Sequence, residues 1–165
     1  MLTEPKIERR DAVPYLGIRA QVPMTELPIF IPESLGELFP WLGKRGVQPA
    51  GPPFIRFHAI DMSAKLEVEV GIPVSSTLSG EGQIQPSVLP SGRYVSLVYT
   101  GVDNGIEANA ALLDWAAKQG LALDRWDTPD GDTFAGRFES FLTDAAQESD
   151  RSKWETEVAI RLAGA

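Results

Sequence analysis

Charged and apolar residues alternate in two segments of similar sequence, residues 65–74 and 153–162. In the first segment apolar residues take every second place, and Glu67 and Glu69 lie between them. Since successive side chains of a strand point to opposite faces, both segments are predicted to be strands with one apolar and one polar face. Four acids on the polar faces are therefore expected to be solvated: Glu67, Glu69, Glu155 and Glu157.

Three further blocks recur in the same order along the chain. They are residues 15–18 with 94–97, residues 38–46 with 112–120, and residues 56–58 with 137–139. Four matches in one order predict an internal duplication. This alignment makes His58 the counterpart of Glu139.

Each predicted module contains a strand, a helix and two more strands, in that order. The predicted strands are residues 14–22, 54–60 and 66–74 in the first module, and residues 93–100, 133–142 and 154–162 in the second. Sequential strands usually lie side by side, and the apolar face of a sheet must be covered. We therefore predict the α+β class, with an antiparallel sheet, both helices on one face, and the two modules related by a pseudo-two-fold axis.

The first helix is predicted to begin at Ser34, which forms a capping box with Glu37, and to end near Gly46. Pro40 lies inside this pattern and is expected to kink or shorten the helix. The second helix is predicted over residues 105–119. Segments punctuated by Pro, Gly, Ser or Asp are predicted as loops: residues 23–32, 75–92 and 121–132.

A chain of 165 residues suits one domain, residues 1–165, in which two small modules share a core. The modules are expected over about residues 12–76 and 92–165, with a linker at 77–91. The seam between them is the first place where we expect a ligand site.

Composition narrows the possible functions. A net charge of −8 repels phosphate backbones, so direct binding of nucleic acid is not expected. No segment approaches the roughly 20 apolar residues that span a bilayer, and the start of the chain does not look like an export signal. The chain has no cysteine, so we expect a cytoplasmic protein without disulfides, and no metal or cofactor is indicated.

Glu139 is the first candidate site residue, because it lies in an apolar segment between Phe138 and Phe141. An unpaired carboxylate among aromatic rings costs several kcal/mol to desolvate unless a cation meets it. That cation is either a ligand or one of two nearby arginines, Arg56 and Arg137, and both possibilities remain open.

His58, the single histidine, is either a hydrogen-bonded structural residue or part of the same site. Aromatic side chains could stack on a flat cation, with roughly 0.5 to 2 kcal/mol for each cation–π contact. Trp126 has no counterpart in the other module and falls in a predicted loop, which makes it a groove candidate. The predicted ligand-binding set is Glu139, Trp126, Trp154, Phe57, Tyr94, Phe141 and His58, and Phe54 and Tyr99 are further aromatic candidates.

Five blocks of this chain together resemble the GyrI-like family, the effector-binding domain of some AraC-type and MerR-type multidrug-responsive regulators. They are residues 51–58, 66–74, 89–94, 114–121 and 139–144. The resemblance implies a cleft between the modules for lipophilic, often cationic, aromatic compounds. The acid that family members direct at such cations, in the pattern Glu-x-Tyr, matches Glu139-Ser140-Phe141, which lacks the phenolic hydroxyl.

Three functions follow as hypotheses. The first is a free-standing protein that binds many lipophilic aromatic cations, since no DNA-binding segment precedes the domain. The second is a hydrolase of strained, cyclopropane-bearing toxins that uses Glu139, as the resemblance implies for some members. The third is a protein-interaction module, such as a topoisomerase inhibitor, whose protein partner is unknown.

Overall fold

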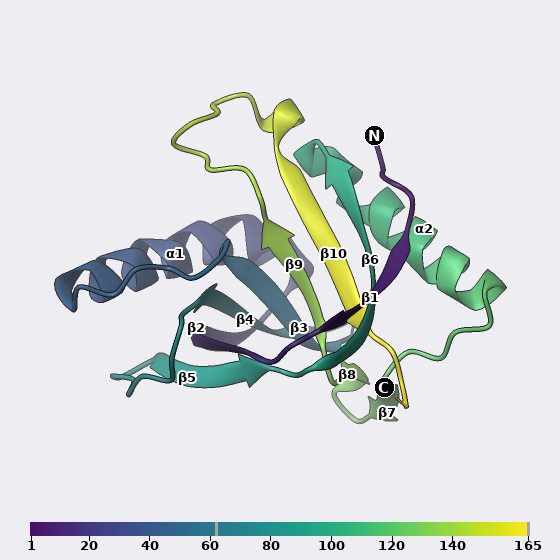
Figure 1. Ribbon diagram of the computed structural model, residues 1–165, viewed down its shortest axis with the longest axis horizontal. Coiled ribbons are helices and arrows are strands. Elements are labelled where there is room, and N and C mark those ends of the chain that lie inside the picture. Colours follow the sequence, from purple (N-terminus) through teal and green to yellow (C-terminus); the bar gives the residue numbers. More distant parts are fainter. Residues whose placement is uncertain (62, 165) are drawn as a thin grey trace.

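The computed structural model describes residues 1–61 and 63–164, which form one ten-stranded antiparallel sheet and two long helices (Figure 1). The helices are α1 (Leu27–Lys44) and α2 (Gly105–Lys118), and both lie on the same side of the sheet. The strands are β1 (Lys6–Arg10), β2 (Val13–Val22), β3 (Phe54–Ile60), β4 (Leu66–Pro73), β5 (Ile84–Leu89), β6 (Gly92–Thr100), β7 (Arg125–Thr128), β8 (Gly131–Phe134), β9 (Arg137–Phe141) and β10 (Glu155–Arg161). Short 3-10 turns occupy Met24–Glu26, Val102–Asn104 and Arg151–Lys153.

The order of the strands is symmetric about the contact between β3 and β9. From that seam outward the sheet runs β3-β4-β2-β5 in one direction and β9-β10-β6-β1 in the other. The outermost strands are exchanged: β1 precedes β2 in the chain but pairs with β6, and β5 precedes β6 but pairs with β2. The predicted α+β class, with an antiparallel sheet and both helices on one face, is confirmed. The first half runs β2, α1, β3, β4, and in the second half β7 and β8 come between α2 and the pair β9 and β10.

Helix α1 begins earlier than the sequence pattern indicated. It starts at Leu27 with Pro28 in its first turn, where a missing backbone N–H costs little, and Ser34 is buried inside the helix instead of capping it. Pro32 and Pro40 both lie within its 18 residues. The prediction of a loop over residues 23–32 was therefore wrong for residues 27–32, because packing of an apolar face on the sheet outweighs weak local propensity.

The ends of both helices match the prediction. Gly46 follows α1 with a φ of 66°, and Gly120 follows α2 with a φ of 69°, a left-handed conformation that glycine adopts without strain. The backbone N–H of Val47 then donates to the carbonyl of Leu42, and that of Leu121 donates to the carbonyl of Ala116.

The sequence pattern missed four strands wholly or in part. Strand β5 lies in the predicted linker, β7 and part of β8 lie in the predicted loop at 121–132, and β1 was not expected. These strands are short or rich in polar residues, and β1, β5 and β7 lie at sheet edges, where side chains need not alternate between core and solvent. Trp126 therefore lies on a strand rather than in a loop.

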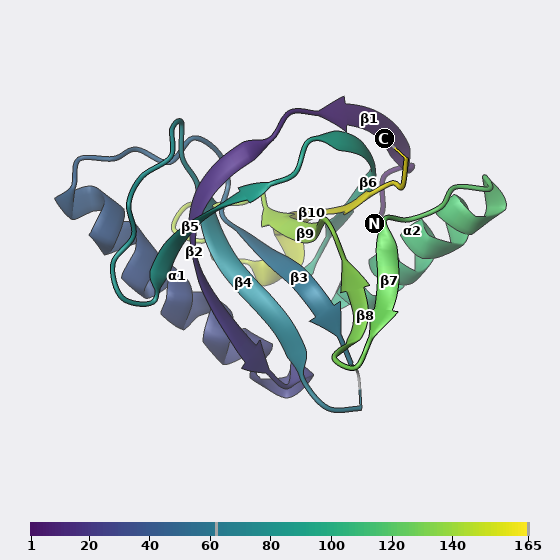
Figure 2. The ribbon, with the colours of Figure 1, turned by 90° about the horizontal axis from the view of Figure 1, so that it is seen from below.

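The two faces of the sheet carry different residues. Apolar side chains from both halves pack beneath the helices in two clusters, one around Val68 and Leu38 and the other around Leu97 and Leu112. The face of the sheet away from α1 and α2 is here called the helix-free face (Figure 2). It carries a third cluster, which includes Tyr15, Phe54 and Phe138. No helix in the described part of the chain is long and apolar enough to cross a bilayer.

Candidate functional site: a cavity at the seam between the two halves

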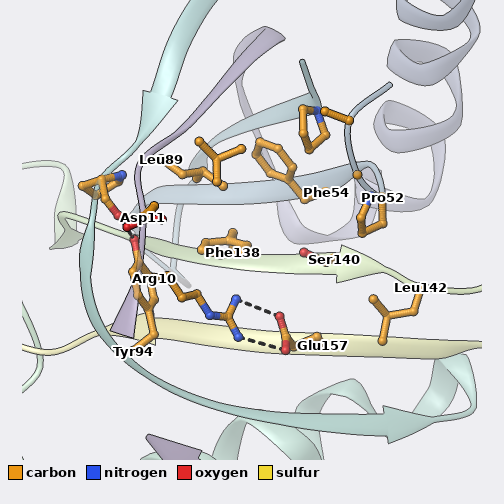
Figure 3. A pocket seen from close by; sticks show the side chains of 15 residues that line it. Arg10, Asp11, Pro52, Phe54, Leu89, Tyr94, Phe138, Ser140, Leu142 and Glu157 are labelled. Carbon is orange, nitrogen blue, oxygen red and sulfur yellow. Dashed lines mark hydrogen bonds and ion pairs between the residues drawn. The ribbon is translucent and has the colours of Figure 1, made fainter. Parts of the chain in front are cut away.

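A cavity of about 250 Å³ opens on the helix-free face beside the contact of β3 with β9 (Figure 3). Both halves of the chain contribute to its lining, together with the exchanged strands β1 and β5. Most of the lining is apolar, with Phe54, Leu89, Phe138 and Leu142 among its residues. The seam expected from the sequence is therefore hollow on this face.

Four aromatic rings form a row across the sheet next to the cavity. The rings of Tyr15 and Phe54 have centroids 4.9 Å apart, those of Phe54 and Phe138 5.8 Å, and those of Phe138 and Tyr94 5.7 Å. All three contacts are edge-to-face, the arrangement favoured by the ring quadrupoles. The hydroxyl of Tyr94 donates to the carbonyl of Pro90 at 2.6 Å, which holds this ring in place at the cavity wall.

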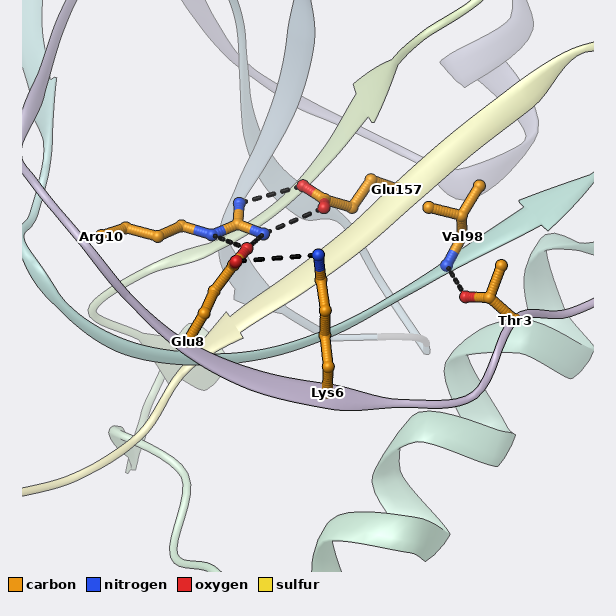
Figure 4. Close-up of polar contacts among 6 residues, drawn as sticks. All are labelled: Thr3, Lys6, Glu8, Arg10, Val98 and Glu157. Carbon is orange, nitrogen blue, oxygen red and sulfur yellow. Dashed lines mark hydrogen bonds and ion pairs between the residues drawn. The ribbon is translucent and has the colours of Figure 1, made fainter.

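Two acids line the cavity, Asp11 and Glu157, and Glu157 pairs with Arg10 from β1 (Figure 4). Two parallel hydrogen bonds of 2.9 Å join the guanidinium to the two carboxylate oxygens. The side chains of Arg10 and Glu157 are only 21% and 17% exposed. Burial lowers the pKa of Arg10, but the hydrogen bonds and charges of Glu157 and Glu8 outweigh it, so the pKa is raised overall.

Glu69 takes the corresponding place in the first half of the sheet. It is 5% exposed, accepts a 2.5 Å hydrogen bond from the hydroxyl of Tyr15, and lies 2.9 Å from Nε2 of His58. Arg56 donates to the same hydroxyl at 3.0 Å. Burial raises the pKa of Glu69, but the hydrogen bonds from His58 and Tyr15 outweigh it and lower the pKa overall.

The four acids predicted to be solvated thus differ from one another. Glu155 is exposed and Glu67 is half-buried, whereas Glu69 is buried and Glu157 lines the cavity. For Glu69 and Glu157 the prediction was wrong, because the helix-free face is partly covered by β1 and by aromatic side chains instead of being open to water.

Glu139 points to the other side of the sheet, toward α2. Its carboxylate accepts hydrogen bonds from the hydroxyl of Tyr99 at 2.9 Å and from the amide of Asn109 at 3.3 Å. Desolvation raises the pKa of Glu139, although these hydrogen bonds and the charge of Arg137 oppose it. Within the described residues neither Arg56 nor Arg137 forms an ion pair with Glu139, and Arg137 instead donates to Asn109 at 2.9 Å.

The other predicted site residues are spread over the molecule. Phe57 and Phe141 pack in the core beneath α1. His58 forms a hydrogen bond with the carboxylate of Glu69. The indole N–H of Trp154 donates to the carbonyl of Glu148, and Trp126 is 48% exposed on β7. Tyr94 is the member of the predicted ligand-binding set that lines the cavity. Phe54, one of the further aromatic candidates, also lines it.

The register of the sheet explains why Glu139 and His58 lie on different faces. Phe54 lies opposite Gly71, and Phe138 lies opposite Ala159 at the matching place in the second half, so Phe54 and Phe138 are counterparts. The counterpart of Glu139 is then Ile55. The sequence alignment that paired His58 with Glu139 therefore differs from the register of the sheet by an odd number of residues. A shift by an odd number moves every side chain of a strand to the opposite face.

The chain belongs to the GyrI-like family. The model of the GyrI-like small molecule binding domain matches residues 3–163. No curated protein sequence matches the chain.

Several solved structures share this fold. A cryo-EM structure of an EcmrR–DNA complex has a TM-score of 0.75 at 18% identity, covering 96% of this chain and 57% of that chain. The crystal structure of the EcmrR C-terminal domain has a TM-score of 0.70 at 18% identity, covering 98% of both chains. SAV2435 bound to tetraphenylphosphonium has a TM-score of 0.64 at 10% identity, covering 98% of this chain and 95% of that chain. At these identities the likeness is one of fold.

Proposed function

We propose that the cavity at the seam binds small, lipophilic aromatic compounds that carry a positive charge, with Glu157 as the counter-charge. The observation that carries this proposal is a half-buried carboxylate beside the rings of Tyr94 and Phe138, in a cavity lined by both halves of the chain. Ring faces and carboxylates select for charge and flatness rather than detailed shape, so binding of several related compounds is expected.

Two further findings support a cationic ligand, and a third supports a small-molecule ligand. The net charge of −8 attracts cations from solution. A structure of the same fold, SAV2435, is bound to tetraphenylphosphonium, which is a lipophilic aromatic cation. The family to which the chain belongs is described as a small-molecule binding domain.

The test is a fluorescence titration of the protein with a lipophilic cationic dye and with its neutral analogue. Wild-type protein is expected to prefer the cation. Glu157→Gln removes the counter-charge and leaves Arg10 facing the ligand, so affinity for the cation should fall about tenfold or more, whereas affinity for the neutral analogue should change little.

Glu139→Gln is the matched control, because it removes the same charge from the other face of the sheet. The variant should bind the cationic dye like wild type. If Glu139→Gln loses the preference for the cation and Glu157→Gln keeps it, the site lies beneath α2 and the proposal for the cavity is wrong. Mass analysis of the recovered ligand separates binding from hydrolysis, since a hydrolysed ligand is heavier by one water.

A further inference from the structure

The guanidinium of Arg10 makes the contacts that a bound planar cation would make. Its two terminal nitrogens donate to the two carboxylate oxygens of Glu157, and its central carbon lies 5.5 Å from the centroid of the Tyr94 ring and 5.9 Å from that of Phe138 (Figure 3). Both ring distances lie within the range of cation–π attraction, about 6 Å. The protein thus places its own cation on the carboxylate and rings that line the cavity.

We propose that Arg10 occupies the ligand's cation position and that the site selects planar cations with in-plane N–H donors, namely arylamidines and arylguanidines, over quaternary cations. This inference rests on the proposed function of the cavity. A carboxylate held in bidentate geometry is satisfied by a fork of two N–H donors, which amidinium and guanidinium groups present. A quaternary ammonium or phosphonium has no N–H and leaves both oxygens of Glu157 without donors once Arg10 is displaced.

Glu8 offers the displaced Arg10 side chain a second partner. The guanidinium already donates to the carboxylate of Glu8 through Nε at 3.1 Å and Nη2 at 2.8 Å (Figure 4). When a ligand takes over Glu157, Arg10 can keep the ion pair with Glu8, which is 41% exposed. Only the side chain of Arg10 has to turn. The backbone of β1 stays paired with β6, where Arg10 lies opposite Gly92.

The size of the cavity agrees with such an exchange. Pockets for drug-sized ligands usually measure about 300–1,000 Å³. With Arg10 in place the cavity measures about 250 Å³, enough for a small ring compound only. Moving the Arg10 side chain toward Glu8 extends the cavity over the rings of Tyr94 and Phe138, because Arg10 itself is part of the lining.

The experiment compares phenylguanidine with trimethylphenylammonium by isothermal titration calorimetry, using the full chain. Wild type is expected to prefer phenylguanidine. Arg10→Ala removes the internal competitor, so affinity for phenylguanidine should rise about tenfold and affinity for trimethylphenylammonium should rise less. Arg9→Ala is the matched control, since it removes the same charge from the neighbouring, exposed position of β1 and should leave both affinities unchanged.

Two further variants keep the test decisive if Arg10→Ala folds poorly. Arg10→Gln retains most of the side-chain stem and should also raise affinity for phenylguanidine. Glu8→Gln removes the second partner of Arg10, so the guanidinium is held by Glu157 alone and affinity for phenylguanidine should fall.

The outcomes separate this inference from the proposed function. If the cationic dye and phenylguanidine bind neither wild type nor the Arg10 variants, the proposed function fails. If the dye binds but wild type prefers trimethylphenylammonium, or removal of Arg10 does not raise affinity for phenylguanidine, the inference fails and the proposed function stands.

Discussion

Phe54 and Phe138, one from each half of the chain, meet edge to face at the seam with ring centroids 5.8 Å apart. They are counterparts in the sheet, and each also contacts the tyrosine of its own half, Tyr15 or Tyr94. The centre of the helix-free face therefore holds a continuous row of buried aromatic rings between two carboxylates. Glu69 is satisfied within its own half, whereas Glu157 is satisfied by an arginine from an edge strand.

The Phe138 ring is expected to contribute to binding through its π face. Phe138→Leu keeps an apolar side chain at the seam but removes the ring, so affinity for the cationic dye should fall about two- to tenfold. A fluorescence titration measures this change. An unchanged affinity would show that the ligand does not stack on Phe138.

Gly71 leaves no room for a side chain, because the rings of Phe54 and Tyr15 lie close to its backbone. A Cβ atom there would be 2.7 Å from Cζ of Phe54 and 2.8 Å from Cδ2 of Tyr15, so Gly71→Ala should destabilise the protein by about 1–3 kcal/mol. Gly36→Ala is the control, because its Cβ meets nothing within 4 Å and alanine favours a helix by roughly 0.5–1 kcal/mol. Urea denaturation of both variants should give free energies of unfolding that shift in opposite directions.

Glu69 should make stability depend on pH in the acid range. The pKa of Glu69 is lowered in the folded protein, so its ionised carboxylate stabilises the fold. This contribution to the free energy of unfolding is fully present above the unfolded-state pKa, and it is lost as the pH falls through the folded-state pKa. Glu69→Gln should be less stable than wild type by about 1–3 kcal/mol at neutral pH, and the difference should shrink on acidification. Denaturation curves across this pH range provide the test, and a difference that does not vary with pH contradicts it.

Glu139 should show the opposite dependence. Desolvation raises its pKa, so its charged form destabilises the folded protein at neutral pH and protonation relieves this as the pH falls. Glu139→Gln should therefore gain stability relative to wild type as the pH rises. The same denaturation series compares the two variants, and equal slopes for Glu69→Gln and Glu139→Gln would show that the two environments do not differ.

Much of the architecture could be predicted from the sequence, because it depends on patterns that extend over many residues. The alternation around Val68 and Val158 indicated two strands correctly, and the glycines indicated where both helices end. Edge strands such as β1 and β5 could not be predicted, since they are stabilised by pairing and carry little apolar periodicity.

The acid that we propose for the site was harder to predict, because its place depends on the register between strands. Glu69 and Glu157 align in the longest repeated block, and that agreement was the available signal for a shared role. Their alternation with apolar residues suggested solvent exposure, since a sequence does not show that β1 and the aromatic side chains cover the polar face. Glu139 is singled out by the aromatic residues Phe138 and Phe141, but Phe138, the adjacent one, lies on the opposite face of the sheet.

The proposal that ligands bind in the cavity on the helix-free face is tested most directly by a crystal structure with a bound aromatic cation, such as phenylguanidine. The ligand is expected in the cavity on the helix-free face, with its charged group at Glu157, its ring against Phe138 or Tyr94, and the Arg10 side chain turned toward Glu8. A ligand bound beneath α2 beside Glu139, with the pair of Arg10 and Glu157 intact, would contradict it.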